Sequence, residues 1–539
     1  MKFEWQRLRA GAKLQAPNRQ TPGKLQNPNF KIVRLAIATI ILATTGLKVW
    51  AQDAPPNQPT AAAASADDIK ALRQKIEELE RKVKELEDRN KSGAQPDKEK
   101  TDELEQKVKI LERNRELDVE AAEAKAKEAP KITVGSDGFS FGNADGSYAI
   151  QLKGVLQVDS RTFFHDAGIV GNDGFLLRRA RPVLQGTVAR DFDFLFVPDF
   201  GGSSVQIFDA YLNYRYRPEL QLRAGKMKSP IGLEQLQADV DILFNERSLV
   251  TDLLPNRDIG IVLQGDILGG VASYAAGIFN GLGDGRSTSN FDFEDDKAFE
   301  GRVFFQPFKT TSIYALQGFG FGLGGSYETM QKTNTTGLPA TTGGTLAGFV
   351  TDGQQQFFAY NPAGGAVVVA DGEHWRLSPQ AYYYYGPFGF LGEYITSEQR
   401  VTRVLGPARI TRRLKNTAWQ VSGSWILTGE DAAYKGGVNP RHPFNPLAGE
   451  WGAWQLVGRY EQLDVDNDAF PLFSNPASSA TFAAAWSVGL NWYLNRNFLI
   501  KASFSHTDFE GGGGPGTSAP AAVTRKDENV LFTRMQLAF

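Results

Sequence analysis

The residue types that most often carry chemistry are scarce in this chain of 539 residues. Cysteine is absent, and the four histidines are widely spaced, with none in a ligand-like pair. These features exclude disulfide scaffolds, zinc–thiolate sites and cysteine nucleophiles. We therefore expect no enzyme, no cofactor and no metal site. The histidines are His165, His374, His442 and His506.

A run of basic residues in the second half of the chain is the clearest local charge pattern. Six bases follow Glu398 with no acidic residue between them. Two interpretations stay open. A solvated external loop would leave these charges in water, whereas a position beside a pore mouth would make them a funnel that concentrates anions. The six residues are Arg400, Arg403, Arg409, Arg412, Arg413 and Lys415.

The segments that must position such residues differ sharply in composition. Of the 62 residues from Asp67 to Glu128, 35 are charged and none is aromatic, so this stretch cannot build a globular core. The 409 residues from Lys131 to Phe539 include 57 aromatics and 52 glycines. The net charge of −2 argues against a general nucleic-acid binder, and we expect no nucleic-acid partner.

The chain begins with a segment typical of protein targeting. Basic residues run to Arg34, an apolar stretch runs from Leu35 to Leu47, and small residues allow cleavage after Ala51. An apolar stretch of about 13 residues is shorter than the roughly 20 needed to span a bilayer. We predict a signal peptide over residues 1–51 rather than a permanent anchor, then a linker over 52–66. The long leader leaves a misplaced start codon open.

A heptad pattern follows the linker and predicts a coiled coil over residues 67–128. Apolar residues spaced alternately by three and four form a seam that another helix must bury. A solitary charged helix is the alternative, but six consecutive seam positions favour self-association. The pattern does not fix the number of helices. The seam consists of Ile69, Leu72, Ile76, Leu79, Val83 and Leu86, and resumes after residues 92–96 at Leu104, Val108 and Leu111.

Strand-like alternation dominates residues 131–539. Trp419, Val421 and Trp425 alternate with Gln420 and Ser422, so one face is apolar and the other polar. Such alternation, repeated with aromatic residues, is typical of lipid-facing strands. We predict an all-β transmembrane barrel of about sixteen antiparallel strands, preceded by the helical coiled coil. The expected strand centres are Leu156, Leu184, Phe194, Tyr211, Leu222, Leu263, Ala275, Val303, Leu323, Gln380, Phe390, Val421, Leu456, Leu490, Ala502 and Met535.

Three short motifs in this region resemble the phosphate-selective porins O and P. They are Leu177-Arg178-Arg179-Ala180-Arg181, Phe208-Asp209-Ala210-Tyr211-Leu212 and Gly225-Lys226-Met227-Lys228-Ser229-Pro230-Ile231-Gly232-Leu233-Glu234. The resemblance implies a sixteen-stranded trimer that conducts anions past an inward-folded third loop, here Ser229 to Arg257. It also implies that the anion site comprises Arg179, Arg181, Asp209, Lys226 and Lys228.

The chemistry of these residues suits an anion path. Arginine offers a rigid fork of donors and lysine a compact charge. Arg179 and Arg181 differ by two and so share a strand face; facing lipid at mid-depth would cost about 2–4 kcal/mol each. The carboxylate of Asp209 is expected to hold these bases in place. Alternation from Leu222 puts Lys228, like Lys226, on the lipid face unless a bulge at Gly225 resets the register or the strand ends early.

These observations predict an outer-membrane porin that conducts anions, with phosphate or polyphosphate as the expected substrates. Residues 131–539 hold 34 basic and 40 acidic residues, so any anion selectivity must come from local placement. A general diffusion porin for small hydrophilic solutes is one alternative. A barrel anchor whose coiled coil serves a structural role toward the cell wall is another. The expected partners are outer-membrane lipid, phosphate or other anions, two further copies in a homotrimer, and the cell wall through the periplasmic coiled coil.

Overall fold

A computed structural model describes most of the chain from residue 130 onward and scattered helical residues between 81 and 120. The continuous ranges are 130–164, 171–202, 204–287, 295–331, 346–362, 364–513 and 524–539. The chain divides into two compact units, Met1–Ile110 and Leu111–Phe539. The predicted signal peptide, the linker and most of the predicted coiled coil lie outside the described residues. Within the described residues, no helix has the length and apolar composition needed to cross a bilayer.

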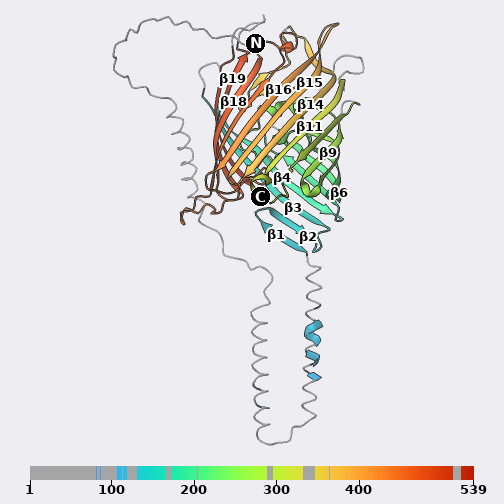
Figure 1. Ribbon diagram of the computed structural model, residues 1–539, viewed down its shortest axis with the longest axis vertical. Helices are drawn as coiled ribbons and strands as arrows, with labels where there is room; N and C mark the ends of the chain where they lie inside the picture. Colours follow the sequence, from blue (N-terminus) through green and yellow to red (C-terminus); the bar gives the residue numbers. More distant parts are fainter. Residues whose placement is uncertain are drawn as a thin grey trace, which may run out of the picture. The chain divides into compact units, whose positions relative to one another are not determined.

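Sixteen of the described strands form one closed antiparallel barrel (Figure 1). Each pairs with the next along the chain, and the last pairs with the first, as Met535 does with Val158. Closure leaves no free strand edge in the wall. The strands are β3 (Ala149–Phe163), β4 (Gly174–Val188), β5 (Phe192–Asp199), β6 (Gln206–Arg217), β7 (Leu220–Lys228), β8 (Arg257–Ile267), β9 (Ala272–Phe279), β10 (Ala298–Phe305), β11 (Phe319–Gln331), β14 (Val367–Tyr385), β15 (Phe388–Leu405), β16 (Ala408–Ile426), β17 (Ala453–Asp464), β18 (Ala480–Tyr493), β19 (Phe498–Gly511) and β20 (Glu528–Ala538).

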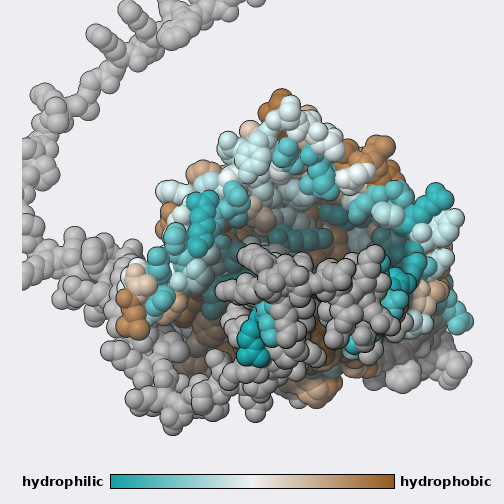
Figure 2. Space-filling view, turned by 90° about the horizontal axis from the view of Figure 1, so that it is seen from below, coloured by the Kyte–Doolittle hydropathy of each residue, from teal (hydrophilic) through white to brown (hydrophobic). Residues whose placement is uncertain are grey.

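The predicted barrel is confirmed, because each of the sixteen predicted centres lies in a different strand of it. In β16, Val421 and Trp425 face outward and are about half exposed, whereas Ser422 and Ser424 face the lumen and are buried. Alternation therefore sorts apolar side chains toward lipid and polar ones toward the interior. Seen from below, hydrophilic side chains surround the hollow of the barrel and hydrophobic ones gather at its outer flanks (Figure 2).

A short hairpin that the sequence analysis did not predict precedes the barrel. Its strands are β1 (Lys131–Gly135) and β2 (Gly138–Gly142), and β2 pairs with the first residues of β3 beyond the end of β20. The Phe139 ring packs edge-on against that of Phe539, with 6.2 Å between their centroids. The hairpin thus extends the barrel sheet at the end where the chain enters β3.

The connections between strands differ at the two ends of the barrel. The chain enters β3 and leaves β20 at one end, here named the entry end; the opposite end is named the far end. Residues 229–256 at the far end contain α4 (Leu233–Leu236) and η2 (Leu249–Leu253). The other short elements are β12 (Phe349–Val350), β13 (Gln356–Phe358) and η4 (Asn467–Ala469) at the far end, and η3 (Leu268–Gly270) and α5 (Tyr314–Gln317) at the entry end.

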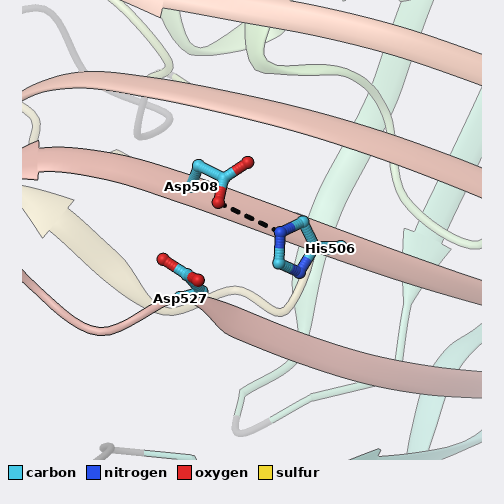
Figure 3. A group of neighbouring side chains, drawn as sticks. All are labelled: His506, Asp508 and Asp527. Carbon is cyan, nitrogen blue, oxygen red and sulfur yellow. Dashed lines mark hydrogen bonds and ion pairs between the residues drawn. The ribbon is translucent and has the colours of Figure 1, made fainter. Parts of the chain in front are cut away.

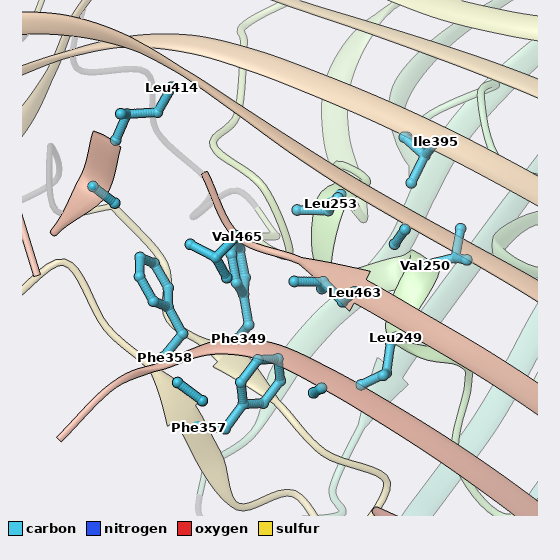
Figure 4. Close-up of a cluster of buried hydrophobic side chains, with 14 of the residues drawn as sticks. Leu249, Val250, Leu253, Phe349, Phe357, Phe358, Ile395, Leu414, Leu463 and Val465 are labelled. Atoms are coloured by element: carbon cyan, nitrogen blue, oxygen red, sulfur yellow. The ribbon is translucent and has the colours of Figure 1, made fainter. Parts of the chain in front are cut away.

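Far-end connections pack together inside the barrel around an apolar cluster (Figure 4). Leu249 and Leu253 of η2 meet Phe349 and Phe358 of the β12–β13 hairpin, all almost fully buried. Burying one such side chain contributes about 1.5–3 kcal/mol, so the two connections stabilise each other against the wall. The wall contributes Ile395, Val401, Leu414, Ala418, Leu463, Ala480, Ala483 and Phe509.

Candidate functional site

Residues 229–256, here named the lumen loop, have the place and length expected of the third loop. Gln157 of β3 donates to the carbonyl of Asp239 at 3.2 Å, and Asn491 of β18 donates to the carbonyl of Leu243 at 3.0 Å. Inward-facing side chains from several wall strands hold the loop, which therefore lies across the lumen. The other wall contacts come from Gln380, Glu393, Gln420, Arg459, Glu461, Lys501 and Gln536.

Four arginines surround the carboxylate of Asp239 in the lumen loop. The Arg179 Nε lies 3.3 Å from Oδ2 and the Arg257 Nη2 lies 3.9 Å from the same oxygen. Arg181 and Arg247 each bind this carboxylate through Nη1. Burial alone would raise the pKa of Asp239, but the surrounding guanidinium groups hold that pKa well below its ordinary value. The carboxylate therefore stays ionised and draws the arginines together.

Glu246 gathers a second group of arginines in the same loop. The Arg178 guanidinium binds it with two hydrogen bonds, Nε to Oε1 at 2.6 Å and Nη2 to Oε2 at 2.8 Å. Arg161 adds a bond of 3.0 Å, and the Arg534 Nη2 lies 3.9 Å away. Burial raises the pKa of Glu246, but Arg178 outweighs it and leaves that pKa below its usual range. The two clusters together fix the loop to β3, β4 and β20.

The predicted role of Asp209 toward Arg179 and Arg181 is wrong. Asp209 lies against Arg257, with Nε to Oδ1 at 3.3 Å, while Arg181 pairs with Asp199 at 2.7 Å. The β5–β6 pairing skips one residue between Asp209 and Ile207. The extra residue, Phe208, places its ring between the Arg181 and Arg257 guanidinium groups, 3.8 and 3.9 Å from its centroid. Asp209 therefore holds Arg257, which lies on the opposite side of the Phe208 ring from Arg181.

A cavity of about 190 Å³ lies on the far-end side of the lumen loop. Four guanidinium groups line it, from Arg178, Arg179, Arg247 and Arg257, facing the carboxyls of Asp239, Glu246 and Asp252. Burial raises the pKa of Asp252 well above its ordinary value. The four guanidinium groups outnumber the three carboxyls that line the cavity. One water needs roughly 10–15 Å³, so an oxyanion with several waters fits.

Some guanidinium nitrogens of the two arginine clusters are buried without a hydrogen-bond acceptor in the described ranges. They are the Nε of Arg161, the Nε of Arg179, which lies in ion-pair distance of Asp239, the Nη2 of Arg181 and the Nη1 of Arg534. A buried donor without an acceptor costs about 1–3 kcal/mol. An oxyanion is the ligand that such donors favour, because hydrogen bonds between charged groups are short and strong.

A second cavity, of about 400 Å³, lies on the entry-end side of the loop. Its basic lining residues are Arg223, Lys228, Arg302 and Lys435, with Asp266 as the acidic one. Residues 235–239 of the lumen loop lie between the two cavities, since Gln235 and Asp239 line the first and Leu236 lines the second. Basic side chains therefore line both sides of this barrier.

The two predicted lysines of β7 lie in different settings. Both ladders of β7 run without a shift through Gly225, so the bulge considered above is absent. Gly225 instead adopts φ +132°, where an added Cβ would lie 2.3 Å from the carbonyl oxygen of Ala210. Lys228 is the last residue of the strand, and its Nζ donates to the Gln237 carbonyl in the lumen loop at 2.6 Å. Lys226 is also buried, with 9% of its surface exposed.

The six bases of residues 400–415 are not in a loop, and they do not share one face. They lie in β15 and β16, joined by a turn at residues 406–407. Leu414 and Ala418 point into the apolar cluster, so alternation puts Arg413 and Lys415 on the outside. Arg400 is paired with Arg413 and so also faces outward. By the same alternation Arg409 faces outward, and Arg403 and Arg412 lie on the lumen side.

Sequence reasoning missed several residues of the site. The β3–β4 pairing skips Arg178, because Gln157 pairs with Arg179 and Val158 pairs with Leu177. This bulge lets neighbouring arginines both reach the lumen loop, which strict alternation forbids. The other missed residues are Arg161, Asp199, Asp239, Glu246, Arg247, Arg257 and Arg534. Two of these residues had a signal in the sequence. Arg247 lies within the predicted third loop, and Arg257 lies at its end.

One group of side chains in the described ranges has the composition of a metal site. His506, Asp508 and Asp527 offer ligand atoms within 4.8 Å of one another (Figure 3). The His506 Nε2 lies 3.0 Å from the Asp508 carboxylate, and its Nδ1 lies 2.8 Å from the Asn529 amide oxygen. Both aspartates are exposed, and these contacts satisfy the ring nitrogens, so the group is explained as a surface ion pair.

The closed sixteen-stranded barrel, its outward apolar face and the loop across its lumen define a porin of the outer-membrane type. The sequence profile of the family described as phosphate-selective porin O and P matches residues 150–539, and the chain belongs to this family. Porins are channels rather than enzymes.

Several known proteins are similar to this chain. Porin O of Pseudomonas aeruginosa is 24% identical over 414 residues, which cover 71% of this chain and 90% of that protein. Among solved structures, the channel DcaP of Acinetobacter baumannii is 12% identical, with a TM-score of 0.46 and coverage of 73% and 98% of the two chains. An anion-selective porin from Comamonas acidovorans is 10% identical, with a TM-score of 0.44 and coverage of 73% and 100%.

Proposed function

We propose that this porin is selective for anions and binds phosphate or polyphosphate at the lumen loop. The observation that carries the proposal is the cluster of four arginines around Asp239, where the loop crosses the lumen. An even number of strands returns both chain ends to one side. The far end faces the outside of the cell and the entry end faces the periplasm, since most entry-end connections are the short turns that outer-membrane barrels place in the periplasm.

In the proposed path, an anion enters the far-end cavity, passes residues 235–239 and leaves through the entry-end cavity. Arg178, Arg179 and Arg257 replace part of its hydration shell in the first cavity. Lys228 receives it on the other side of the barrier. The carboxylates of Asp239 and Glu246 compete for the same guanidinium groups, which keeps any single site from holding the anion too long.

Phosphate block of chloride current in a planar bilayer tests this function. The parent protein is expected to pass chloride and to lose that current as phosphate is added, because phosphate occupies the narrow site longer than chloride. Sulfate and a dicarboxylate, added separately, rank the preference among anions. Equal passage of potassium and chloride with no block by phosphate would instead identify a general diffusion porin.

We predict that Lys228→Ala abolishes phosphate block while the barrel stays folded. The variant removes the positive charge at the barrier, whereas its hydrogen bond to the Gln237 carbonyl is one of many that hold the loop. Arg179→Ala is expected to weaken the block only partly, because Arg181 still binds Asp239. Lys309→Ala, at an exposed entry-end position, is the control and should match the parent. If phosphate blocks the Lys228 variant as strongly as it blocks the parent protein, Lys228 is not part of the anion site.

We also predict that the mature chain begins near Gln52 and assembles as a trimer, with its helical segment in the periplasm. The heptad seam requires partner helices, and the β1–β2 hairpin exposes Ile132 and Val134 by 62% and 68%. Neighbouring copies would cover such apolar side chains. The mass of the complex after mild detergent extraction measures the assembly, and a persistent monomer would contradict it.

A further inference from the structure

The entry-end cavity holds basic side chains that are not bound to a carboxylate. They are Arg223, Lys228, Arg302 and Lys435, and within the described ranges none of the four forms an ion pair. The acidic lining residue, Asp266, is exposed and has no ion-pair partner there either. In the far-end cavity, by contrast, carboxylates already bind the arginines. A cavity lined mainly by bases of this kind favours an anionic ligand.

Four further acids lie close enough to act on these bases, but each is already bound to other groups. Asp209 and Asp239 bind arginines of the far-end cluster. Asp241 and Glu393 accept hydrogen bonds from backbone N–H groups. None of the four lines the entry-end cavity, so a ligand in it meets Asp266 as the lining acid.

Aromatic rings orient the two guanidinium groups of this cavity. The Arg223 guanidinium lies over the Tyr211 ring, 4.4 Å from its centroid, and that of Arg302 lies over the Phe304 ring at 4.4 Å. Arginine stacks on a ring through its flat face, which leaves the N–H groups at its edge for other partners. Within the described ranges the buried Arg223 Nε has no acceptor, and Arg302 donates through Nε alone, to Gln380 at 2.9 Å. The other donors remain for a phosphate group.

Three neutral amide side chains lie beside Arg223. Arg223 pairs with Asn213 across the β6–β7 ladder, and Gln221 pairs with Gln264 two residues nearer the entry end. The Asn213 Nδ2 donates to Gln221 at 3.1 Å, and the Gln264 Nε2 donates to Asn213 at 3.4 Å. Each amide has two donor hydrogens and an acceptor oxygen with two lone pairs, so this chain leaves donors and acceptors unused. Hydroxyl groups, which both donate and accept, match such a surface.

The space next to Arg223 is larger than an inorganic ion needs. The entry-end cavity measures about 400 Å³, and a third cavity, of about 310 Å³, shares Arg223 with it and is lined by Asn213. Both volumes lie within the range of small-molecule sites, about 300–1,000 Å³, whereas the far-end cavity of about 190 Å³ lies below it. Met227 and Val262 give the entry-end cavity an apolar side, on which the C–H groups of an organic ligand pack.

We propose that the entry-end cavity binds phosphate esters of small polyols, such as glycerol 3-phosphate. The guanidinium groups of Arg223 and Arg302 bind the phosphate through charge-assisted hydrogen bonds. The amides of Asn213, Gln221 and Gln264 bind the hydroxyls of the polyol. The inference rests on the proposed passage of anions and names an organic substrate class for it.

The test compares the binding of glycerol 3-phosphate and propyl phosphate to the purified porin by isothermal titration calorimetry. Propyl phosphate has the same carbon chain and phosphate group but lacks the two hydroxyls, so the comparison isolates the hydroxyl contacts. The amide variant is Gln221→Met/Gln264→Met, because methionine keeps the shape of glutamine without its hydrogen-bonding groups. Arg223→Gln removes a phosphate contact, and Lys309→Gln, at an exposed entry-end position, is the control. Heat-modifiable migration in gels verifies that each barrel is folded.

We expect the parent to bind glycerol 3-phosphate roughly tenfold more tightly than propyl phosphate, since two hydrogen-bonded hydroxyls give a preference of that scale. The amide variant should bind the two esters alike. Arg223→Gln should bind both esters roughly tenfold more weakly, and the control should match the parent. Equal Kd values for the two esters in the parent, or a preference that survives in the amide variant, would overturn the proposal. Unchanged binding by Arg223→Gln would also overturn it.

Ion selectivity and phosphate block, measured on the same preparations, report on the proposed function separately. A channel that shows neither, yet prefers glycerol 3-phosphate to propyl phosphate through the amides, would refute the proposed function and support the polyol-phosphate site. An anion-selective channel that binds the two esters equally would support the proposed function and refute the polyol-phosphate site.

Discussion

Replacing Arg178, Arg179 and Arg257 together by glutamine is expected to abolish the anion preference of the channel. These residues supply three of the four guanidinium groups in the far-end cavity. Without them, one guanidinium faces the three carboxyls that line the cavity, so the local charge changes from positive to negative. The zero-current potential across a KCl gradient should then fall to zero or change sign.

The barrel of this variant should stay folded, because the two carboxylates that bind the replaced arginines, those of Asp239 and Glu246, keep other arginine partners. Asp239 retains Arg181 and Arg247, and Glu246 retains Arg161. A control with three exposed entry-end bases replaced by glutamine carries the same change in total charge. If both variants keep the potential of the parent, selectivity resides elsewhere in the lumen. The control bases are Arg190, Arg215 and Lys309.

Arg534→Met is expected to destabilise the barrel by about 3–5 kcal/mol. Arg534 and Asp159 face each other across β20 and β3, fully buried and joined by two hydrogen bonds of 2.7 Å. Removing one partner leaves an uncompensated charge in the interior. Equilibrium unfolding by urea in detergent micelles measures the change.

The double variant Asp159→Leu/Arg534→Met provides the matched comparison. Replacing both partners of a buried pair by apolar residues is often close to neutral, so the double variant should recover most of the lost stability. If it is as unstable as the single variant, the loss comes from packing rather than from an unpaired charge. If the single variant is as stable as the parent, the pair does not hold the barrel closed.

The strands could be predicted from the sequence because their signal is local. Alternation of apolar and polar residues fixes which side of a strand faces lipid, and each barrel strand carries its own copy of the pattern. The β1–β2 hairpin was missed because five residues per strand give too few alternations to stand out. The β12–β13 hairpin was missed because its phenylalanines face the lumen loop rather than lipid.

The partners of the site residues could not be predicted, because they are far apart in sequence. Arg178 binds an acid 68 residues away, and Arg459 binds Asp352 from 107 residues away. The bulge at Arg178 was not predicted either, but it leaves intact the two-residue spacing on which the inward assignment of Arg179 and Arg181 was based. Arg179 faces the lumen, since the regular pairing of β4 with β3 resumes at Arg179, which pairs with Gln157.

The basic run near residue 400 shows what strand periodicity could have added. Once residues 408–426 are recognised as one strand, Arg409, Arg413 and Lys415 fall on the same side as Trp419. That side carries the lipid-facing aromatics. The number of basic residues alone suggested an anion funnel. The alternation of side chains along the strands instead separates four outward bases from Arg403 and Arg412, which lie on the lumen side.

The most direct test of the central claim is to locate a bound oxyanion in crystals of the purified porin. Arsenate is a close mimic of phosphate, and its anomalous scattering identifies it without ambiguity. A peak is predicted in the far-end cavity, within about 3 Å of guanidinium nitrogens of Arg178, Arg179 or Arg257, the distance of charge-assisted hydrogen bonds. A peak elsewhere in the lumen, or none under conditions where arsenate blocks the current, would contradict the assignment of this cavity as the anion site.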